Sequence, residues 1–397
     1  MAALIGNVRT SHIRTDAPVP QTSVKSLRYG IIGAGLMARE HVRNLALIAG
    51  SQVTAIADPE RQSQERCGRE VAEFLQGDPK LFGDHKALLA SGLVDALIIA
   101  SPNDTHKAVL DDIFRAKTAY PVLCEKPIVT RAEDILPLAA AAKAHKAPVW
   151  TAMEYRYMPP LQELMQEIRG GTIGRLKMLS IREHRFPFLP KVDDWNRFNA
   201  RTGGTLVEKC CHFFDLMRLI TTSEAVRVFA SGAADVNHRD ERYGGRVPDI
   251  IDNAFVIVEF ANGVRASLDL CMFAEGAYFQ EEITATGDVA QVQAYIPVAG
   301  SHWPDQGRER HAEIEISPRA TLKPVRRAVA VDAAILKAGN HHGSTYYEHL
   351  GFRRAVLEGG RVEVTVEDGL KAVAIGIAGE RSMAEGRAVT LDGYRID

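Results

Sequence analysis

Short apolar segments alternate with helix-period patterns between Tyr29 and Trp150. Apolar residues between these segments recur at helical spacing, as at Leu110, Ile113 and Phe114. Alternation of short buried strands with amphipathic helices is typical of a parallel, doubly wound α/β sheet. We therefore expect a Rossmann-like domain over residues 28–150, with strands at 29–32, 53–57, 94–100, 121–124 and 147–152.

After Trp150 the pattern changes to longer strands of alternating polar and apolar residues. A turn at 261–263 joins two such strands, 256–260 and 264–270, and predicts a hairpin. We expect residues 151–397 to form an α+β domain with a large, mostly antiparallel open sheet, whose final helices can pack back on the first domain. The other expected features are exposed loops at 237–249 and 299–311, a helix at 346–357, and a helix through Leu370, Val373 and Ile377 that begins with the capping-box pair Thr365 and Asp368.

The composition of the 397 residues is that of an ordinary soluble globular protein. Lys and Arg number 48 and Asp and Glu 50, so there is no global field to attract nucleic acid or a membrane. The 5 cysteines include no CxxC pair, and they predict reduced thiols of a cytoplasmic protein rather than disulfides or a zinc site. Residues 1–27 are either a disordered tail or an arm that embraces another subunit.

A glycine motif follows the first expected strand. Gly33 permits a tight turn, and Gly35 lets a pyrophosphate approach the backbone. The next helix begins with Leu36 and Met37, and its amino terminus supplies free N–H groups and the positive end of the helix dipole. These positions predict a dinucleotide-binding turn.

Asp58 ends the second expected strand, where a carboxylate can accept hydrogen bonds from both ribose hydroxyls of NAD. A carboxylate there repels the 2′-phosphate of NADP, so we expect NAD as the cofactor. Arg61 could instead stack on adenine or neutralise a phosphate. The alternative role of Asp58 is a simple cap of the turn before Pro59, which would leave the choice of cofactor open.

Seven motifs then occur in order along the chain. They are GIIGAGLMA at 30–38, SPNDTH at 101–106, CEKP at 124–127, YRYMPP at 155–160, GTIG at 171–174, TGGTLVEKCCHFFDL at 202–216, and the closing helix. With these motifs the chain resembles the glucose-fructose oxidoreductase, inositol dehydrogenase and rhizopine-catabolism family of NAD(P)-dependent oxidoreductases, Gfo/Idh/MocA. The resemblance covers residues 28–390 and implies metal-free oxidation of a carbohydrate, but it names no substrate.

Lys126 lies in the Glu125-Lys126-Pro127 motif at the carboxyl end of an expected strand, where parallel sheets bind cofactors. The resemblance implies that Lys126 binds or deprotonates the reacting hydroxyl and that Glu125 and Lys126 both contact the cofactor. An ammonium there can stabilise a developing alkoxide, and we expect burial to lower its pKa enough to help proton transfer. The resemblance adds Ser101, Asn103 and His106 as cofactor ligands and Tyr155 and Arg156 as substrate ligands, with a capped turn and packing between domains as the alternatives.

Glu208, His212 and Asp215 share one face of an expected helix, within about 60° of one another. The rest of this helix is apolar, so these polar residues enter a buried setting. The resemblance implies that His212 carries a proton or binds a sugar, and that Glu208, where the family usually has Asp, orients it. Asp215 is a further candidate as a substrate ligand, and the alternative for all three is a buried ion pair that only holds the helix.

Between Arg182 and Lys209, six Lys and Arg residues stand against four Asp and Glu, on a strand and loop expected to face the cofactor. These cations could bind an anionic sugar or be ordinary solvated side chains. The polar segment before the penultimate helix offers further sugar ligands, with a polar helix start as the alternative. The candidates are Arg182, His184, Arg201, Lys209, His342 and Tyr346, beside Arg185, Lys191, Arg197 and His341.

The leading interpretation is an NAD-dependent oxidoreductase that acts on a secondary hydroxyl of a sugar, cyclitol or glycoside, with Lys126 and His212 handling the proton. Its rival is a redox-neutral NAD-dependent glycosidase or lyase, in which oxidation acidifies a neighbouring C–H and permits elimination, water addition and re-reduction. A non-catalytic sugar or NAD sensor is the third alternative, and the presence of Lys126 speaks against it. We expect a homo-oligomer, a dimer or tetramer, assembled through the second sheet.

Overall fold

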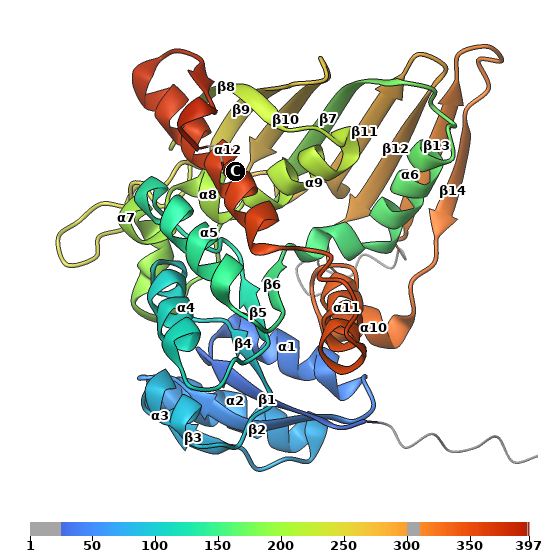
Figure 1. The fold of residues 1–397 in the computed structure, drawn as a ribbon. Coiled ribbons are helices and arrows are strands. Elements are labelled where there is room, and N and C mark those ends of the chain that lie inside the picture. The colour runs from blue at the N-terminus through green and yellow to red at the C-terminus, as the bar shows by residue number, and fades with distance from the viewer. Residues whose placement is uncertain (1–24, 300–309, 395, 397) are drawn as a thin grey trace, which may run out of the picture.

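The computed structural model describes residues 25–299, 310–394 and 396, which fold around two sheets (Figure 1). The tail expected over residues 1–27 and the loop expected at 299–311 fall almost entirely outside these ranges. The predicted fold class is confirmed, because a parallel sheet comes first and a larger, mostly antiparallel sheet follows.

The first sheet has six parallel strands in the order β3-β2-β1-β4-β5-β6. Five of them lie where the sequence predicts strands. The three-residue edge strand β3 was missed because it is too short to carry a periodic pattern. The strands are β1 Leu27–Ile32, β2 Ser51–Ala57, β3 Lys80–Phe82, β4 Ala96–Ile99, β5 Val122–Glu125 and β6 Val149–Ala152, and the helices between them are α1 Leu36–Ala46, α2 Arg61–Leu75, α3 His85–Ala90, α4 His106–Arg115 and α5 Ile135–Ala144.

The second sheet has nine strands in the order β14-β13-β12-β11-β7-β10-β9-β8-β15. Only β7 and β10 pair in parallel; every other neighbouring pair is antiparallel. The predicted hairpin joins β9 to β10, and Gly263 takes the positive φ of 83° that its turn requires. The strands are β7 Leu176–His184, β8 Ala225–Ala233, β9 Asn253–Phe260, β10 Arg265–Cys271, β11 Phe279–Gly287, β12 Ala290–Pro297, β13 Ala312–Pro318, β14 Val325–Val329 and β15 Val389–Thr390.

Helices cover one face of this second sheet. Helix α6 packs on β12 and β13, α9 on β7, and α12 on β8. The predicted capping box of Thr365 and Asp368 begins α12. The helices of this part are α6 Pro159–Arg169, α7 Asn199–Thr202, α8 Thr205–Glu208, α9 Cys211–Thr221, α10 Ala333–Ala338, α11 Ser344–Glu358 and α12 Val366–Glu385.

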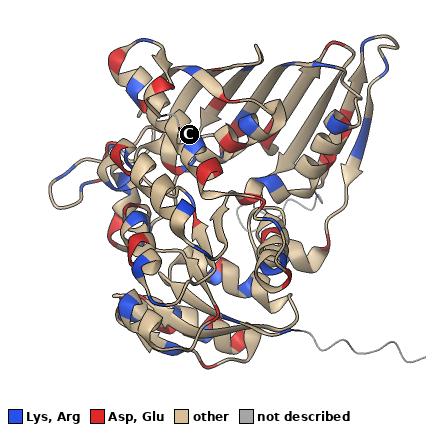
Figure 2. Cartoon of the chain, viewed as in Figure 1, with Lys and Arg blue, Asp and Glu red and all other residues tan. Residues whose placement is uncertain are grey.

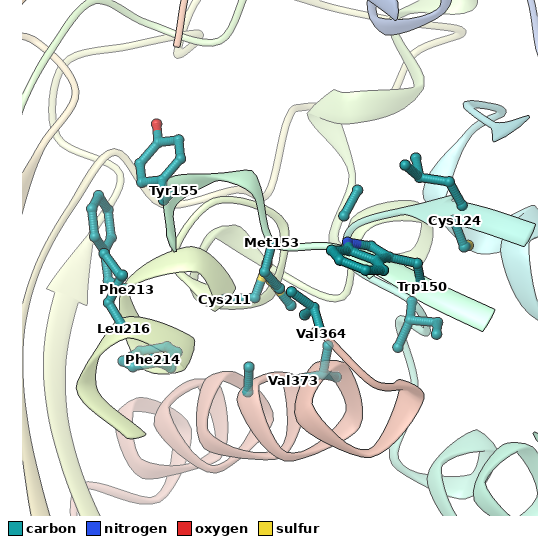
Figure 3. Packing of buried hydrophobic residues seen from close by; sticks show 14 of the residues in the cluster. Cys124, Trp150, Met153, Tyr155, Cys211, Phe213, Phe214, Leu216, Val364 and Val373 are labelled. Carbon is teal, nitrogen blue, oxygen red and sulfur yellow. The ribbon is translucent and has the colours of Figure 1, made fainter. Parts of the chain in front are cut away.

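A shared core joins the two sheets. Helix α12 contacts β6 and α5 of the first domain as well as α9 and β8 of the second. Figure 3 shows Trp150 at the end of the first sheet, Phe213 and Phe214 on α9, and Val373 on α12, all buried in the same cluster. This packing holds the carboxyl edge of the first sheet against α9.

The carboxyl-terminal segment also returns to the first domain, where α10 and α11 pack on α1. The Nδ1 atom of His41 in α1 lies 2.9 Å from Nε2 of His349 in α11. The indole N–H of Trp150 donates to Glu348 at 3.2 Å. These buried polar contacts fix the helix that follows the glycine turn.

Charged side chains of both signs are interspersed over the helices, as along α4 and α6 (Figure 2). No single-sign stripe runs over either helix, in keeping with the formal net charge of −2. In the parts of the chain that the structure describes, no helix combines the length and the apolar character needed to cross a membrane.

Candidate active site

The glycine turn leaves the start of α1 open. Gly33 has a φ of +89°, and a side chain there would collide with the backbone of Ser101. Gly35 caps α1 without any side-chain hydrogen bond, and the space beside its Cα is empty. Unbonded N–H groups at a helix amino terminus are suited to hold a pyrophosphate. The residues present therefore fit a dinucleotide.

Asp58 braces this turn. Its carboxylate accepts the N–H of Ala34 at 2.7 Å and the N–H of Glu60 at 2.8 Å. The carboxylate that caps the turn is thus the same one that is predicted to bind the ribose. Arg61 is directed elsewhere, since it is 88% exposed and pairs with Glu65 at 2.9 Å.

A cleft of about 1050 Å³ runs from the glycine turn to Lys126. Arg66 of α2 lines this cleft, whereas the predicted Arg61 does not. Arg66 was not predicted, although it lies little more than one helical turn beyond Arg61. The predicted residues that line the cleft are Gly33, Gly35, Leu36, Met37, Asp58, Ser101, Asn103, Glu125, Lys126, Lys191, Arg201 and Glu208.

The ammonium of Lys126 lies at the inner end of the cleft and donates to the backbone carbonyl of Glu208 at 3.1 Å. Burial alone would lower the pKa of Lys126, but surrounding acids led by Glu208 raise it above its ordinary value. The expectation of a lowered pKa is therefore wrong, because it counted desolvation and omitted these acids. Lys126 stays a cation and a hydrogen-bond donor.

Two of the loop residues predicted to bind the cofactor form side-chain hydrogen bonds within the protein. The amide of Asn103 donates to the carboxylate of Glu208, and the hydroxyls of Ser101 and Thr105 lie 2.7 Å apart. His106 is fully buried, with its ring nitrogens 2.8 Å from the carbonyl of Pro127 and 2.9 Å from that of Ser101. It ties two loops together and does not line the cleft.

The helix expected to carry Glu208, His212 and Asp215 is broken between α8 and α9. The break sends the three side chains into separate surroundings. The Glu208 carboxylate faces Asn103 and the ammonium of Lys191, 3.9 Å away, so it does not form the expected pair with His212. The Asp215 carboxylate forms a buried ion pair with Arg156, which also donates to the carbonyl of Glu363 at 3.0 Å.

His212 lies flat on Tyr155, with ring centroids 4.1 Å apart and planes 6° from parallel. Its Nε2 atom is 3.6 Å from the carboxylate of Glu154, and its Nδ1 atom has no hydrogen-bond partner among the described residues. Burial, with the ammoniums of Lys126 and Lys209 nearby, holds the pKa of His212 well below its usual value. The ring is therefore a neutral imidazole.

Tyr155 also belongs to a buried polar cluster, whose other members are Lys209, Glu183 and Glu281. Lys209 donates to the Tyr155 hydroxyl at 2.6 Å and lies 2.8 Å from the carboxylate of Glu183. Burial and the neighbouring Glu183 raise the pKa of Glu281 to about 7. Neither of these acids, nor Glu154, was among the residues predicted from the sequence. The signal for Glu183 and Glu281 was present, because each occupies an inward-facing position of an alternating strand.

The expectation that Arg182 and His184 face the cofactor is wrong, because the same alternation places them on the other side of the sheet. Glu183 faces the helices, so its two neighbours on β7 lie on the opposite, open face of the sheet. There Arg182 pairs with Glu282, and His184 with Asp269 at 3.2 Å. Arg201 does reach the cleft, where it pairs with Asp104.

The segment before α11 brings His341, rather than His342 or Tyr346, close to the site. His341 lies 2.9 Å from Glu40 of α1 and 3.9 Å from Glu154. Burial and the adjacent His341 lower the pKa of His342 to about 4. Neither His342 nor Tyr346 lines the cleft. Within the described residues, no group of three or more His, Cys, Asp or Glu side chains is arranged to hold a metal ion.

Comparison with known proteins agrees with this geometry. Residues 27–153 match the domain described as "Oxidoreductase family, NAD-binding Rossmann fold", and residues 165–391 match "Oxidoreductase family, C-terminal alpha/beta domain". The chain is 26% identical to the oxidoreductase YrbE of Bacillus subtilis over 371 residues, 93% of this chain and 97% of that one. It is 27% identical to the myo-inositol 2-dehydrogenase of Thermotoga maritima over 367 residues, 92% of this chain and 99% of that one.

A solved structure repeats the fold. The myo-inositol dehydrogenase of Corynebacterium glutamicum superposes with a TM-score of 0.70 at 21% identity, covering 92% of this chain and 99% of its own. Both family domains and their order thus coincide with the two sheets and the cleft between them. The chain belongs to the Gfo/Idh/MocA family of oxidoreductases.

Proposed function

We propose that this protein oxidises a secondary hydroxyl of a neutral cyclitol or related polyol with NAD as the oxidant. The observation that carries the proposal is that a cationic Lys126, which lines the cleft, lies near a neutral His212, which is buried and does not itself line the cleft. One group can donate hydrogen bonds to an alcohol oxygen, and the other is a neutral imidazole, which can receive its proton.

In this proposal the start of α1 binds the pyrophosphate, and Asp58 binds the adenosine ribose. When bound, the nicotinamide dinucleotide supplies the hydride acceptor. Lys126 holds the reacting oxygen and stabilises the negative charge that develops on it, while His212 takes the hydroxyl proton. Asp58 disfavours a 2′-phosphate, which supports NAD over NADP.

The six Lys and Arg residues between Arg182 and Lys209 form ion pairs within the protein, and these pairs favour a neutral substrate over an anionic one. Each of these six cations has a carboxylate within 4.0 Å, so an incoming anion would have to displace an existing partner. The sequence similarity to an enzyme named myo-inositol 2-dehydrogenase points the same way. The six pairs are Arg182 with Glu282, Arg185 with Glu183, Lys191 with Glu208, Arg197 with Glu241, Arg201 with Asp104 and Lys209 with Glu183.

The test combines two readouts in one cuvette. Purified protein is mixed with NAD or NADP and a panel of cyclitols, neutral sugars and neutral or anionic aryl glycosides, while nicotinamide reduction and aglycone release are recorded. We expect reduction in step with consumption of a neutral polyol, and faster with NAD. Aglycone release that needs NAD without consuming it would instead support the glycosidase, and no response to any substrate would contradict both enzymes.

The open face of the second sheet supports a homo-oligomer. Alternation along the strands places apolar side chains on this face, and Phe255 is 67% exposed. The others are Met178 on β7, Phe229 on β8 and Ile257 on β9. We propose that a second copy of the chain covers this patch.

Replacing Phe255 with glutamate tests the oligomer. The new carboxylate would lie opposite Asp269 and in the middle of the apolar patch, so we expect the mass in solution to fall to that of a smaller assembly. Light scattering after size-exclusion chromatography gives the mass. Leu136→Glu on α5, where Leu136 is 53% exposed away from this face, is the matched control. An unchanged mass for Phe255→Glu would exclude this face as the interface.

A further inference from the structure

Glu154 is a buried carboxylate at the centre of the site that the reaction outlined above does not use. It lies two residues beyond the end of β6, begins the 3₁₀ turn Glu154–Tyr157 and is 2% exposed. Neither of its oxygens has a hydrogen-bond partner among the described residues. A buried polar group without a partner destabilises a fold, and a charged one does so more strongly. Its position therefore calls for a function.

Two histidines flank this carboxylate from different parts of the fold. Nε2 of His212 on α9 lies 3.6 Å from Glu154, and Nδ1 of His341, before α11, lies 3.9 Å from it. His341 is in turn held by Glu40 of α1 at 2.9 Å. The result is a row of alternating acids and imidazoles, Glu40, His341, Glu154 and His212, that ends at the proposed proton acceptor.

The geometry around His212 selects one arrangement of its ring. Stacking on Tyr155 fixes the plane of the ring. Nε2 faces Glu154, whose ionised carboxylate can only accept a hydrogen bond, so the proton of the neutral ring belongs on Nε2. Nδ1 is then the unprotonated nitrogen; it is enclosed by protein and has no hydrogen-bond partner among the described residues.

We propose that Glu154, rather than Glu208, is the positioning residue that sets the tautomer of His212 and stabilises it as it gains a proton. This rests on the proposed function, in which His212 receives the proton. The substrate O–H bond would break with its proton passing to His212, and the carbon would become a carbonyl by giving up its hydride to the dinucleotide, which the start of α1 and Asp58 would hold. Glu154 stays ionised throughout and balances the imidazolium.

The titratable and charged groups that face Glu154 define its pH dependence. They are His341 before α11, Glu348 in α11, Glu125 and Lys126 at the end of β5, Tyr155 in the turn that Glu154 begins, and Cys211 and His212 on α9. The pKa of Glu154 is raised to about 7. Burial is the largest cause and the neighbouring Glu125 adds to it, while His341 acts in the opposite direction. Because the ionised form is the active one, kcat should rise as the pH passes upward through about 7.

The test compares Glu154→Gln with Glu208→Gln. Glutamine keeps an acceptor for the Nε2 proton but carries no charge, so we expect kcat to fall by about 100-fold with the KM for NAD unchanged within about twofold. The rise of kcat near pH 7 should disappear in Glu154→Gln. Glu208→Gln can lower kcat through its contacts with Asn103 and Lys191, but it should keep that rise.

A second readout needs no substrate. Nitrogen-15 NMR of histidine-labelled protein, with His212→Asn used to assign the signal, should show His212 with its proton on Nε2. A proton on Nδ1 instead, or wild-type kcat and pH profile in a folded Glu154→Gln, would overturn the assignment. If the wild-type protein oxidises no polyol, the proposed function fails, while the tautomer still decides whether Glu154 orients His212.

Discussion

Replacing Lys126 with methionine is expected to lower kcat/KM for the polyol by about 10³-fold, within the range attributed to a positioned proton donor or acceptor. Methionine has similar length but no hydrogen-bond donor, so the alcohol oxygen loses both its anchor and the charge that stabilises the alkoxide. The substitution also leaves Glu125, Glu154 and Glu208 without their shared cation. Steady-state kinetics with NAD and the best substrate of the panel measures the effect.

A measurement of NAD binding distinguishes this loss of kcat/KM from a loss of folding. The glycine turn and Asp58 lie at the other end of the cleft, so the Kd for NAD should change by less than about threefold. Lys126→Arg is the matched control, because it keeps the charge but not the geometry of an ammonium, and we expect intermediate activity. Normal turnover by Lys126→Met would remove Lys126 from the reaction.

Replacing Asp215 with alanine is expected to destabilise the fold by about 3–5 kcal/mol, the usual cost of stranding one partner of a buried ion pair. Asp215 is fully buried, and Arg156 would be left with the weaker contact to Asp368 at 3.5 Å. The pair lies where α9 meets the start of the second domain and α12, so its loss weakens the core shared by both sheets. Urea unfolding followed by circular dichroism gives the free energy.

An exposed ion pair serves as the control for this effect. Glu65→Ala removes the partner of Arg61 on the surface of α2 and should cost less than about 0.5 kcal/mol. Activity then distinguishes the two roles considered for Asp215. A folded Asp215→Ala with nearly normal kcat and KM agrees with a supporting ion pair, whereas unchanged stability with lost activity would restore it as a substrate ligand.

Local patterns identified the elements that depend only on neighbouring residues. The period of apolar positions predicted five of the six strands of the first sheet, and the Asn262-Gly263 turn predicted the β9–β10 hairpin. The capping pair Thr365 and Asp368 likewise fixed the start of α12. Each of these signals is contained within one turn or one strand, where backbone geometry links sequence directly to structure.

Tertiary structure decided which side chains meet. Helical spacing grouped Glu208, His212 and Asp215, but the break between α8 and α9 separated them and brought Glu154 to His212 instead. His341, more than a hundred residues farther along the chain, reached the same carboxylate. The sequence by itself determined the cofactor turn, five strands of the first sheet and the β9–β10 hairpin of the second, because these follow local periods. The partners and pKa values of the site depend on packing between distant segments, and a local pattern does not contain that information.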